Sequence, residues 1–351
     1  MPIKGNSKLS MHLTQRINAF VRLGYYLKQM ASEKRDVQAE TILTKTEAAN
    51  GWFTKENLKF SLHNWGEALS ESNLQQWVAN YQMEAYPPKT IGVVMAGNVP
   101  LVGFHDFLSV LITGNRVLAK LSSNDRALLP FLAQKLIALE PGFEDHIRFT
   151  EEKISNFDAV IATGSNNTAR YFEYYFGKHP NIIRKNRNSI AILSGNETDR
   201  ELNALADDIF RYFGLGCRNV SKIYVPENYD FKTFFKAMFH WKKIIHNHKY
   251  MNNYDYNKAV YLMDGLPLLD NGYMVLKEDN GFSSPISVVF YEKYAALEEL
   301  KEKLEQQSEN IQCIVSNLGL ANEISFGKAQ TPALLDYADG IDTVNFLLKL
   351  H

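Results

Sequence analysis

Cys217 is the residue in this sequence whose type and surroundings are best suited to chemistry. It lies in the segment FGLGCRNVSKIYV, residues 213–225. A cysteine thiolate is a strong nucleophile, and Gly214 and Gly216 remove side-chain bulk beside it, so that a substrate carbonyl can approach closely. The β-branched and aromatic residues 221–225 predict a strand after the loop. The segment therefore predicts a nucleophile on a loop, with a buried and unreactive thiol as the alternative.

Three further polar positions fall where turns are expected. Asn98 follows an apolar run and precedes Pro100, so its amide can donate to a developing oxyanion, unless it is an ordinary turn asparagine. Lys120 ends a second apolar run, and taken alone it is an ordinary solvated lysine. Gly164 and Ser165 precede a predicted helix, whose N-terminal N–H groups suit a pyrophosphate; an ordinary serine cap is the alternative.

Short apolar runs alternate with helical patterns through the middle of the chain. Strands are predicted at 91–95, 117–121, 159–162 and 189–193, and helices at 101–112, 128–139 and 167–176. This alternation indicates βαβ units and a parallel sheet, with ligand-binding turns at the carboxyl ends of its strands. Amphipathic helices are predicted at 9–32 and 55–82. After residue 195 we expect helices at 200–213, 231–248 and 295–307, and strands at 221–225, 286–291 and 311–315.

Four segments resemble, in order, motifs of the aldehyde dehydrogenase superfamily. They are IGVVMAGNVP at 91–100, TGNRVLAK at 113–120, ATGS at 162–165 and the Cys217 segment. The resemblance implies an α/β fold with a Rossmann-type cofactor domain, an α/β catalytic domain and an active site in the cleft between them. It implies that Cys217 is the nucleophile and that Asn98 belongs to the oxyanion hole. It also implies that Lys120 contacts the adenosine ribose and that Gly164 and Ser165 lie beneath the pyrophosphate.

The resemblance also bears on the choice of cofactor. Where members that prefer NAD often carry a glutamate that binds the ribose hydroxyls, this chain has Ser123. A carboxylate would repel a 2′-phosphate, whereas Ser123 and the nearby Arg126 would accept one. We therefore expect NADPH as the cofactor, with NADH as the alternative.

The chain departs from the hydrolytic members of the superfamily at two points. Their water-activating glutamate has no counterpart, because residues 174–195 contain no carboxylate, and their ribose-clamping glutamate is absent from GFSSP at 281–285. A thiol without a water-activating base hydrolyses a thioacyl enzyme poorly. Within the superfamily the chain most resembles the acyl-CoA reductase branch, which includes the fatty-acid reductase subunit of bacterial luminescence. AGNVPLVG at 96–103 and PALLDYADGID at 332–342 carry that likeness.

Composition bounds the class of protein. The 351 residues are 45% hydrophobic and 22% charged with a net charge of −1, which favours a globular enzyme and no nucleic-acid partner. Two cysteines predict a reducing cytoplasmic location, and we expect neither a signal peptide nor a membrane span. His240, His246 and His248 stand among lysines, which argues against a metal site; a solvated helix face or a basic face toward CoA phosphates fits better.

We therefore predict four segments. Residues 1–90 form a helical segment packing on the cofactor domain, 91–195 the NAD(P)-binding domain, 196–330 the catalytic domain, and 331–351 a C-terminal segment whose apolar run at 344–350 suits a homo-oligomer. The predicted activity is NADPH-dependent reduction of a fatty acyl-CoA to the aldehyde through a Cys217 thioacyl intermediate. The alternatives are an acyl phosphate reductase, a CoA-acylating aldehyde dehydrogenase, a silent subunit serving an acyl-activating protein partner, and an unrelated cysteine hydrolase.

Overall fold

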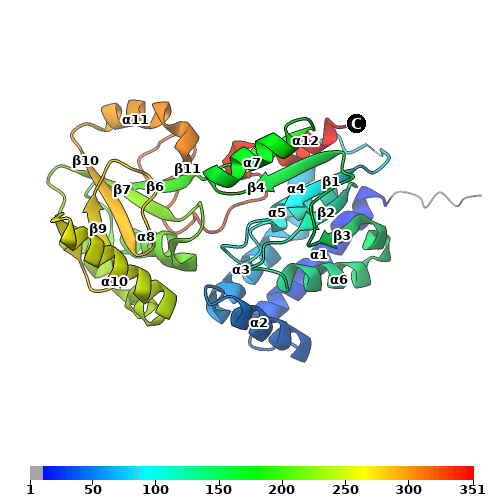
Figure 1. Ribbon diagram of the computed structural model, residues 1–351, viewed down its shortest axis with the longest axis horizontal. Coiled ribbons are helices and arrows are strands. Elements are labelled where there is room, and N and C mark those ends of the chain that lie inside the picture. The colour runs from blue at the N-terminus through cyan, green and yellow to red at the C-terminus, as the bar shows by residue number, and fades with distance from the viewer. Residues whose placement is uncertain (1–10, 85) are drawn as a thin grey trace, which may run out of the picture. The chain divides into compact units, whose positions relative to one another are not determined.

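The computed structural model describes residues 11–84 and 86–351, which form two compact units, each built on its own sheet (Figure 1). The first unit runs to Lys185 and includes Ala333–His351, and the second is Asn186–Pro332. Both combine mostly parallel strands with helices, so the α/β class predicted from the alternating pattern is confirmed.

Four helices precede the first strand. Helix α1 (Leu13–Ala31) buries one apolar stripe, including Phe20, Leu23 and Leu27, against α3 and α6. The segment predicted as one helix at 55–82 is two, because the chain turns at Leu69 and Ser70. The other bounds are α2 (Val37–Ala49), α3 (Lys55–Ala68) and α4 (Glu71–Val78).

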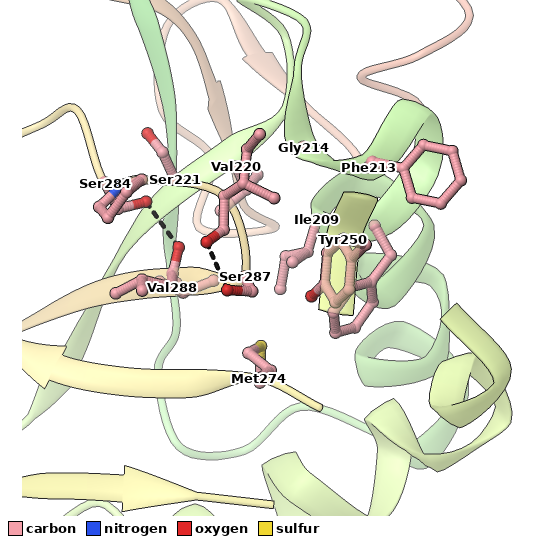
Figure 2. Close-up of a pocket in the computed structure, with 14 residues that line it drawn as sticks. Ile209, Phe213, Gly214, Val220, Ser221, Tyr250, Met274, Ser284, Ser287 and Val288 are labelled. Carbon is pink, nitrogen blue, oxygen red and sulfur yellow. Dashed lines mark hydrogen bonds between the residues drawn. The ribbon is translucent and has the colours of Figure 1, made fainter. Parts of the chain in front are cut away.

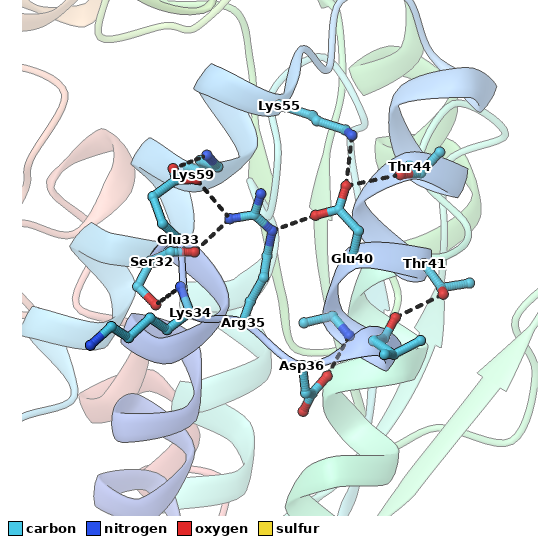
Figure 3. Close-up of polar contacts among 12 residues, drawn as sticks. Ser32, Glu33, Lys34, Arg35, Asp36, Glu40, Thr41, Thr44, Lys55 and Lys59 are labelled. Carbon is cyan, nitrogen blue, oxygen red and sulfur yellow. Dashed lines mark hydrogen bonds and ion pairs between the residues drawn. The ribbon is translucent and has the colours of Figure 1, made fainter.

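An ion-pair network closes the turn between α1 and α2 (Figure 3). Glu40 accepts hydrogen bonds from Arg35 at 2.5 Å and from Lys55 at 2.7 Å, and Glu33 accepts one from Lys59 at 2.6 Å. These bonds to the two basic side chains lower the pKa of Glu40 to about 2. The network lies on the surface and links α2 to α3.

The sheet of the first unit has five parallel strands in the order β3-β2-β1-β4-β5. The strands are β1 (Thr90–Val94), β2 (Arg116–Lys120), β3 (Ile147–Thr150), β4 (Ala159–Thr163) and β5 (Asn181–Arg184); the helices between them are α5 (Phe104–Ile112), α6 (Leu128–Leu139) and α7 (Asn166–Phe176). Helix α5 starts three residues later than predicted, because Leu101 has a φ of 58° and cannot continue a right-handed helix.

The first unit is completed by the C-terminal helix α12 (Thr343–Leu348), drawn in red in Figure 1, which packs on α5. Val344 and Leu347 are fully buried there, so these members of the apolar run lie within the core of the unit. Arg184, the last residue of β5, joins this strand to both helices. It pairs with Asp106 on α5 at 2.6 Å and donates to Thr343 on α12 at 2.9 Å.

The second unit contains seven strands in the order β12-β11-β6-β7-β10-β9-β8, parallel except for the β8–β9 pair. Its strands are β6 (Asn188–Ile192), β7 (Val220–Pro226), β8 (Leu268–Asp270), β9 (Val275–Glu278), β10 (Val288–Tyr294), β11 (Ile311–Val315) and β12 (Glu323–Ile324); its helices are α8 (Asp199–Phe210), α9 (Phe231–Met238), α10 (His248–Met263) and α11 (Leu297–Gln306). Residues 186–195 were predicted to belong to the cofactor domain, but β6 pairs with β7 and β11 in the second sheet.

The helix predicted at 231–248 is replaced by α9 and a 3-10 segment, Phe239–His246, followed by α10. None of the helices in the described part of the chain combines the length and apolar composition of a membrane span.

Candidate active site

Five of the predicted site residues lie at one edge of the first sheet. Lys120 is the last residue of β2, Asn98 follows β1, and Gly164 and Ser165 follow β4; Ser123 lies in the turn after β2. The three strands are parallel neighbours in the order β2-β1-β4, so their carboxyl ends meet. The chain leaves β1 toward β2 on one side, and β4 lies on the other side, which makes this edge a topological switch point of the kind that binds ligands.

The turn after β1 is packed tightly on the turn after β2. At Gly97 an added Cβ would come within 2.6 Å of Ser122, so a larger residue would push the two turns apart. Asn98 is exposed on this turn, and its neighbour Leu101 has a φ of 58°, a conformation that costs energy for a branched side chain. The turn therefore needs support from elsewhere.

A buried carboxylate gives that support. Asp125 is 8% exposed and accepts a hydrogen bond from the N–H of Leu101. Burial raises the pKa of Asp125 to about 6, and the bond from Leu101 opposes that shift. Sequence reasoning missed this residue, because an aspartate in the polar stretch SSND at 122–125 is typical of a solvated turn.

Helix α7 begins at a cramped, capped turn. Ser165 caps the helix by accepting from the N–H of Thr168 at 3.3 Å. A Cβ added at Gly164 would approach Thr168 and Phe172 to 3.0 Å, so a larger residue would have to displace these side chains. The helix N-terminus, with its N–H groups, can attract an anion.

The arginine expected to help bind a 2′-phosphate has another partner. Arg126 pairs with Glu151 at 3.2 Å, and both side chains are largely exposed. Exposed pairs of this kind are weak, so Glu151 can be displaced at small cost.

Cys217 lies in the second unit, in the turn that leads into the amino end of β7, and its residue is exposed. Three consecutive residues before the loop are left-handed: Tyr212, Phe213 and Gly214 have φ values of 54°, 60° and 76°. Non-glycine residues rarely adopt this conformation, and such strain gathers at functional sites. Tyr212 and Phe213 are buried, which offsets the strain through packing.

Asn219 fixes the Cys217 loop to the end of α8. Its side-chain oxygen accepts from the N–H of Gly216 at 2.8 Å. Its amide nitrogen donates to the carbonyls of Asp208, Ile209 and Arg211 at 3.1, 3.2 and 2.7 Å. Asn219 is 3% exposed, so one buried amide, two residues after the nucleophile, satisfies four backbone groups that precede it.

A second anchor joins the two cysteines. Ser189, on β6, donates to the carbonyl of Cys217 at 2.9 Å, and its Oγ lies 2.9 Å from the sulfur of Cys313. A hydroxyl has one proton, so Cys313 must be the donor to Ser189. Burial raises the pKa of Cys313 to about 11, which keeps that thiol protonated. The bonds run from Cys313 through Ser189 to the backbone of Cys217.

Asp208, on α8, holds another neighbouring segment. Its carboxylate accepts from the N–H groups of Gly327 at 2.6 Å and Ala329 at 3.0 Å. The residue is fully buried, and this burial raises its pKa to about 7. Asn219 and Asp208 were not predicted as site residues. The only signal was the position of Asn219, two residues after the cysteine.

Within the described part of the chain, no three histidine, cysteine or acidic side chains gather in a way that could hold a metal ion. Of the three histidines at 240–248, His240 lies 3.0 Å from the carbonyl of Ala237 through Nδ1.

Known structures share this architecture. An aldehyde dehydrogenase from Physcomitrella patens in complex with succinate matches with a TM-score of 0.70 and 14% identity, over 97% of this chain and 85% of that one. An indole-3-acetaldehyde dehydrogenase from P. syringae, in complex with NAD+, gives 0.64 and 15% over 88% and 73%. An NAD+ complex of an aldehyde dehydrogenase from Bacillus cereus gives 0.61 and 14% over 90% and 74%. A comparison with curated proteins found no match.

The fold is therefore that of the aldehyde dehydrogenases, as the sequence motifs predicted. The model of the family described as acyl-CoA reductase (LuxC) matches residues 24–240, more than half of the sequence. The chain belongs to this family, and it is an oxidoreductase acting on aldehyde or oxo groups. The reaction of the family is the reduction of an acyl-CoA to an aldehyde.

Proposed function

We propose that this protein reduces a fatty acyl-CoA to the aldehyde with NADPH, through a thioacyl intermediate on Cys217. The observation that carries the proposal is the Cys217 loop itself. An exposed thiol stands on a strained turn, and Asn219 and Ser189 hold the backbone around it. Such rigid support is what a nucleophile needs in order to meet a carbonyl in one geometry.

A nicotinamide cofactor fits the turns of the first sheet. Two of the similar structures are complexes with NAD+. Gly164 leaves a cramped space beside the start of α7, where a pyrophosphate would meet backbone N–H groups and the side chain of Ser165. Lys120 and Ser123 would hold the adenosine ribose. When bound, the cofactor supplies a hydride.

The residues of the chain perform the remaining work. The Cys217 thiolate bonds to the acyl carbon, and the side-chain amide of Asn98 and the N–H of Cys217 stabilise the oxyanion. Collapse of the oxyanion breaks the bond to the CoA sulfur, which leaves as a thiolate and takes a proton from water. After the acyl carbon has accepted a hydride, the same donors hold the alkoxide. Its collapse breaks the bond to Cys217 and releases the aldehyde.

The lack of a carboxylate in residues 174–195 favours reduction over hydrolysis. Water needs a general base to attack a thioacyl group at a useful rate. We expect the acyl enzyme to survive until hydride arrives, or to exchange its acyl group with another thiol.

The test is acyl-CoA-dependent oxidation of NADPH and of NADH, followed by nicotinamide absorbance. Cys217→Ala should lose at least about 10³-fold in kcat. Cys313→Ser is the matched control, because it changes the only other cysteine and keeps a donor to Ser189. NADPH should be preferred, and Ser123→Glu should shift the preference toward NADH.

Equal loss of activity in the two cysteine variants would overturn the role of Cys217. If no acyl-CoA supports oxidation while Cys217 is alkylated, the acyl donor is instead an acyl phosphate or an acyl group delivered by a partner protein.

A further inference from the structure

One stretch of the second unit, residues 231–254, carries basic side chains and no acidic ones; we call it the basic segment. It spans α9, the 3-10 segment that follows and the start of α10. By contrast, α11 mixes glutamates and lysines along its length, as solvated helices commonly do. All eight basic side chains of the segment are exposed: Lys232, Lys236, His240, Lys242, Lys243, His246, His248 and Lys249.

Most of these lysines have no carboxylate partner. Elsewhere in the second unit, five lysines each lie within 4 Å of a carboxylate oxygen. Within residues 11–84 and 86–351, four lysines of the basic segment form no ion pair, namely Lys232, Lys236, Lys242 and Lys243. An anion bound there would displace no partner, and it would meet several positive charges at once.

An exposed aromatic ring stands among these charges. Phe239 is 63% exposed, and the ammonium group of Lys242 lies 5.4 Å from the centre of its ring. An aromatic ring on a basic surface is a platform on which a nucleobase can stack while lysines contact phosphates. The combination therefore suits a nucleotide with several phosphates better than it suits a simple anion.

Two aromatic anchors join the basic segment to the support of the Cys217 loop. Trp241 stacks on Phe210, the last residue of α8, with ring centres 5.8 Å apart. Tyr250 lies with its ring centre 6.1 Å from that of Phe213, which is four residues before Cys217 (Figure 2). The charged side chains between the two anchors are thus attached to the segment that leads into the nucleophile loop.

We propose that the basic segment binds the adenosine and the phosphate groups of the coenzyme A part of the substrate. This assignment rests on the proposed function and gives the head of the substrate a site of its own. Coenzyme A carries a diphosphate and a 3′-phosphate at the end opposite its thiol. Its pantetheine arm is about as long as five extended residues, roughly 17 Å. The site for the phosphates therefore belongs beside the support of the nucleophile loop and not at the cysteine itself.

The first test compares two thioesters of one acyl group. An acyl-CoA carries the adenosine and the phosphates, and the N-acetylcysteamine thioester carries the same acyl group without them. The double variant Lys242→Glu/Lys243→Glu should lower kcat/KM for the acyl-CoA about tenfold or more, because two attractive charges become repulsive. It should leave kcat/KM for the N-acetylcysteamine thioester unchanged.

The matched control is Lys293→Glu/Lys301→Glu, which makes the same change in net charge on β10 and α11 of the same unit. It should keep the wild-type values for both thioesters. Phe239→Ala should lower kcat/KM for the acyl-CoA about fivefold through the lost stacking, again without an effect on the shorter thioester.

The second test measures binding without turnover. Adenosine 3′,5′-bisphosphate is titrated calorimetrically into the protein in the presence of saturating NADP+, so that the cofactor site is occupied. Its affinity should fall about tenfold in Lys242→Glu/Lys243→Glu and should fall with added salt in the wild type. The control variant should bind as the wild type does.

The outcomes distinguish this site from the proposed function. Equal losses with the two thioesters, or equal binding of the bisphosphate in the wild type and the Lys242/Lys243 variant, would overturn the assignment even if acyl-CoA reduction is confirmed. If no acyl-CoA is reduced, the proposed function fails, and weaker bisphosphate binding in the variant still supports the site. A raised KM for NADPH alone would assign the segment to the cofactor. A loss seen only with an acyl group delivered by a partner protein would assign it to that protein.

Discussion

The two candidate catalytic loops are supported by different chemistry. In the first unit, the turn that carries Asn98 is supported by the carboxylate of Asp125, which accepts from Leu101. In the second unit, the loop that carries Cys217 is supported by the amide of Asn219, which makes four hydrogen bonds. An amide does not titrate, whereas the pKa of Asp125 is about 6.

This difference separates the two loops in their response to pH. The support of the nucleophile loop stays the same across the physiological range. The support of the Asn98 turn, Asp125, changes its charge near pH 6. Both supports are buried and bond to the backbone of the loops, so their role is to hold a strained backbone in place.

The largest effect should come from Asn98, the exposed residue on the turn that Asp125 supports. If Asn98 donates to the oxyanion, Asn98→Ala should lower kcat about 10²–10³-fold. Its exposed position should keep the free energy of unfolding within about 0.5 kcal/mol of the wild type. Steady-state kinetics with an acyl-CoA and chemical denaturation measure the two quantities. A change in kcat of less than about threefold would remove Asn98 from the mechanism.

Asn219 should affect stability more than any other support of the Cys217 loop. Asn219→Ala leaves three carbonyls and one N–H without their buried partner, which should lower the free energy of unfolding by about 2–3 kcal/mol. The rate at which Cys217 is alkylated should change together with the free energy of unfolding. Asn219→Asp keeps the acceptor for Gly216 but places a carboxylate oxygen against three carbonyl oxygens in a buried site, so its loss should be at least as large as that of Asn219→Ala. Equal stability of all three proteins would show that the loop is held by packing alone.

The carboxylates Asp125 and Asp208 should make both units less stable as the pH rises. Burial raises their folded pKa values, to about 6 and about 7, above the ordinary value of 3.8. Between pH 3.8 and the folded pKa of each group, the folded protein thus binds more protons than the unfolded chain. Over that window the free energy of unfolding falls with increasing pH by up to about 1.4 kcal/mol per pH unit for each group. For Asp125 the fall should end near pH 6, and for Asp208 near pH 7.

Hydrogen exchange resolved by peptide distinguishes the units in this test. Asp125→Asn should flatten the pH dependence in peptides of the first unit only, and Asp208→Asn in those of the second. A fall that continues in both variants would assign the pH dependence to other groups.

The sequence could predict the exposed positions of the site better than their supports. Parallel strands bring their carboxyl ends together, and this rule alone places Asn98, Lys120 and Gly164 at one edge. Asp125 and Asn219 could not be found this way, since a polar residue in a turn is usually solvated. Their burial depends on a second segment of chain that packs over them, and no local pattern reports it.

The same reasoning explains the misplaced strand. β6 is a short apolar run like β1 and β4, and a strand buried on both faces has the same pattern whichever sheet it joins. Its neighbours β7 and β11 lie far along the chain, at residues 220–226 and 311–315. The short strands β3, β5, β8, β9 and β12 were missed for a related reason: with two to four residues each, they carry too little periodicity to detect.

The smallest predicted effect concerns the bonds that join the two cysteines. Ser189→Ala removes the hydroxyl between the Cys217 carbonyl and the Cys313 thiol, and it should lower the free energy of unfolding by about 1 kcal/mol. Cys313→Ala should cost a similar amount or more, because it also leaves a small cavity. In the double variant the bond between the two side chains can be lost only once, so the combined loss should be smaller than the sum of the single losses. Denaturation of the four proteins closes this cycle. If the losses add, Cys313 acts only through packing, and the Cys217 loop is supported by Asn219 and Ser189 without it.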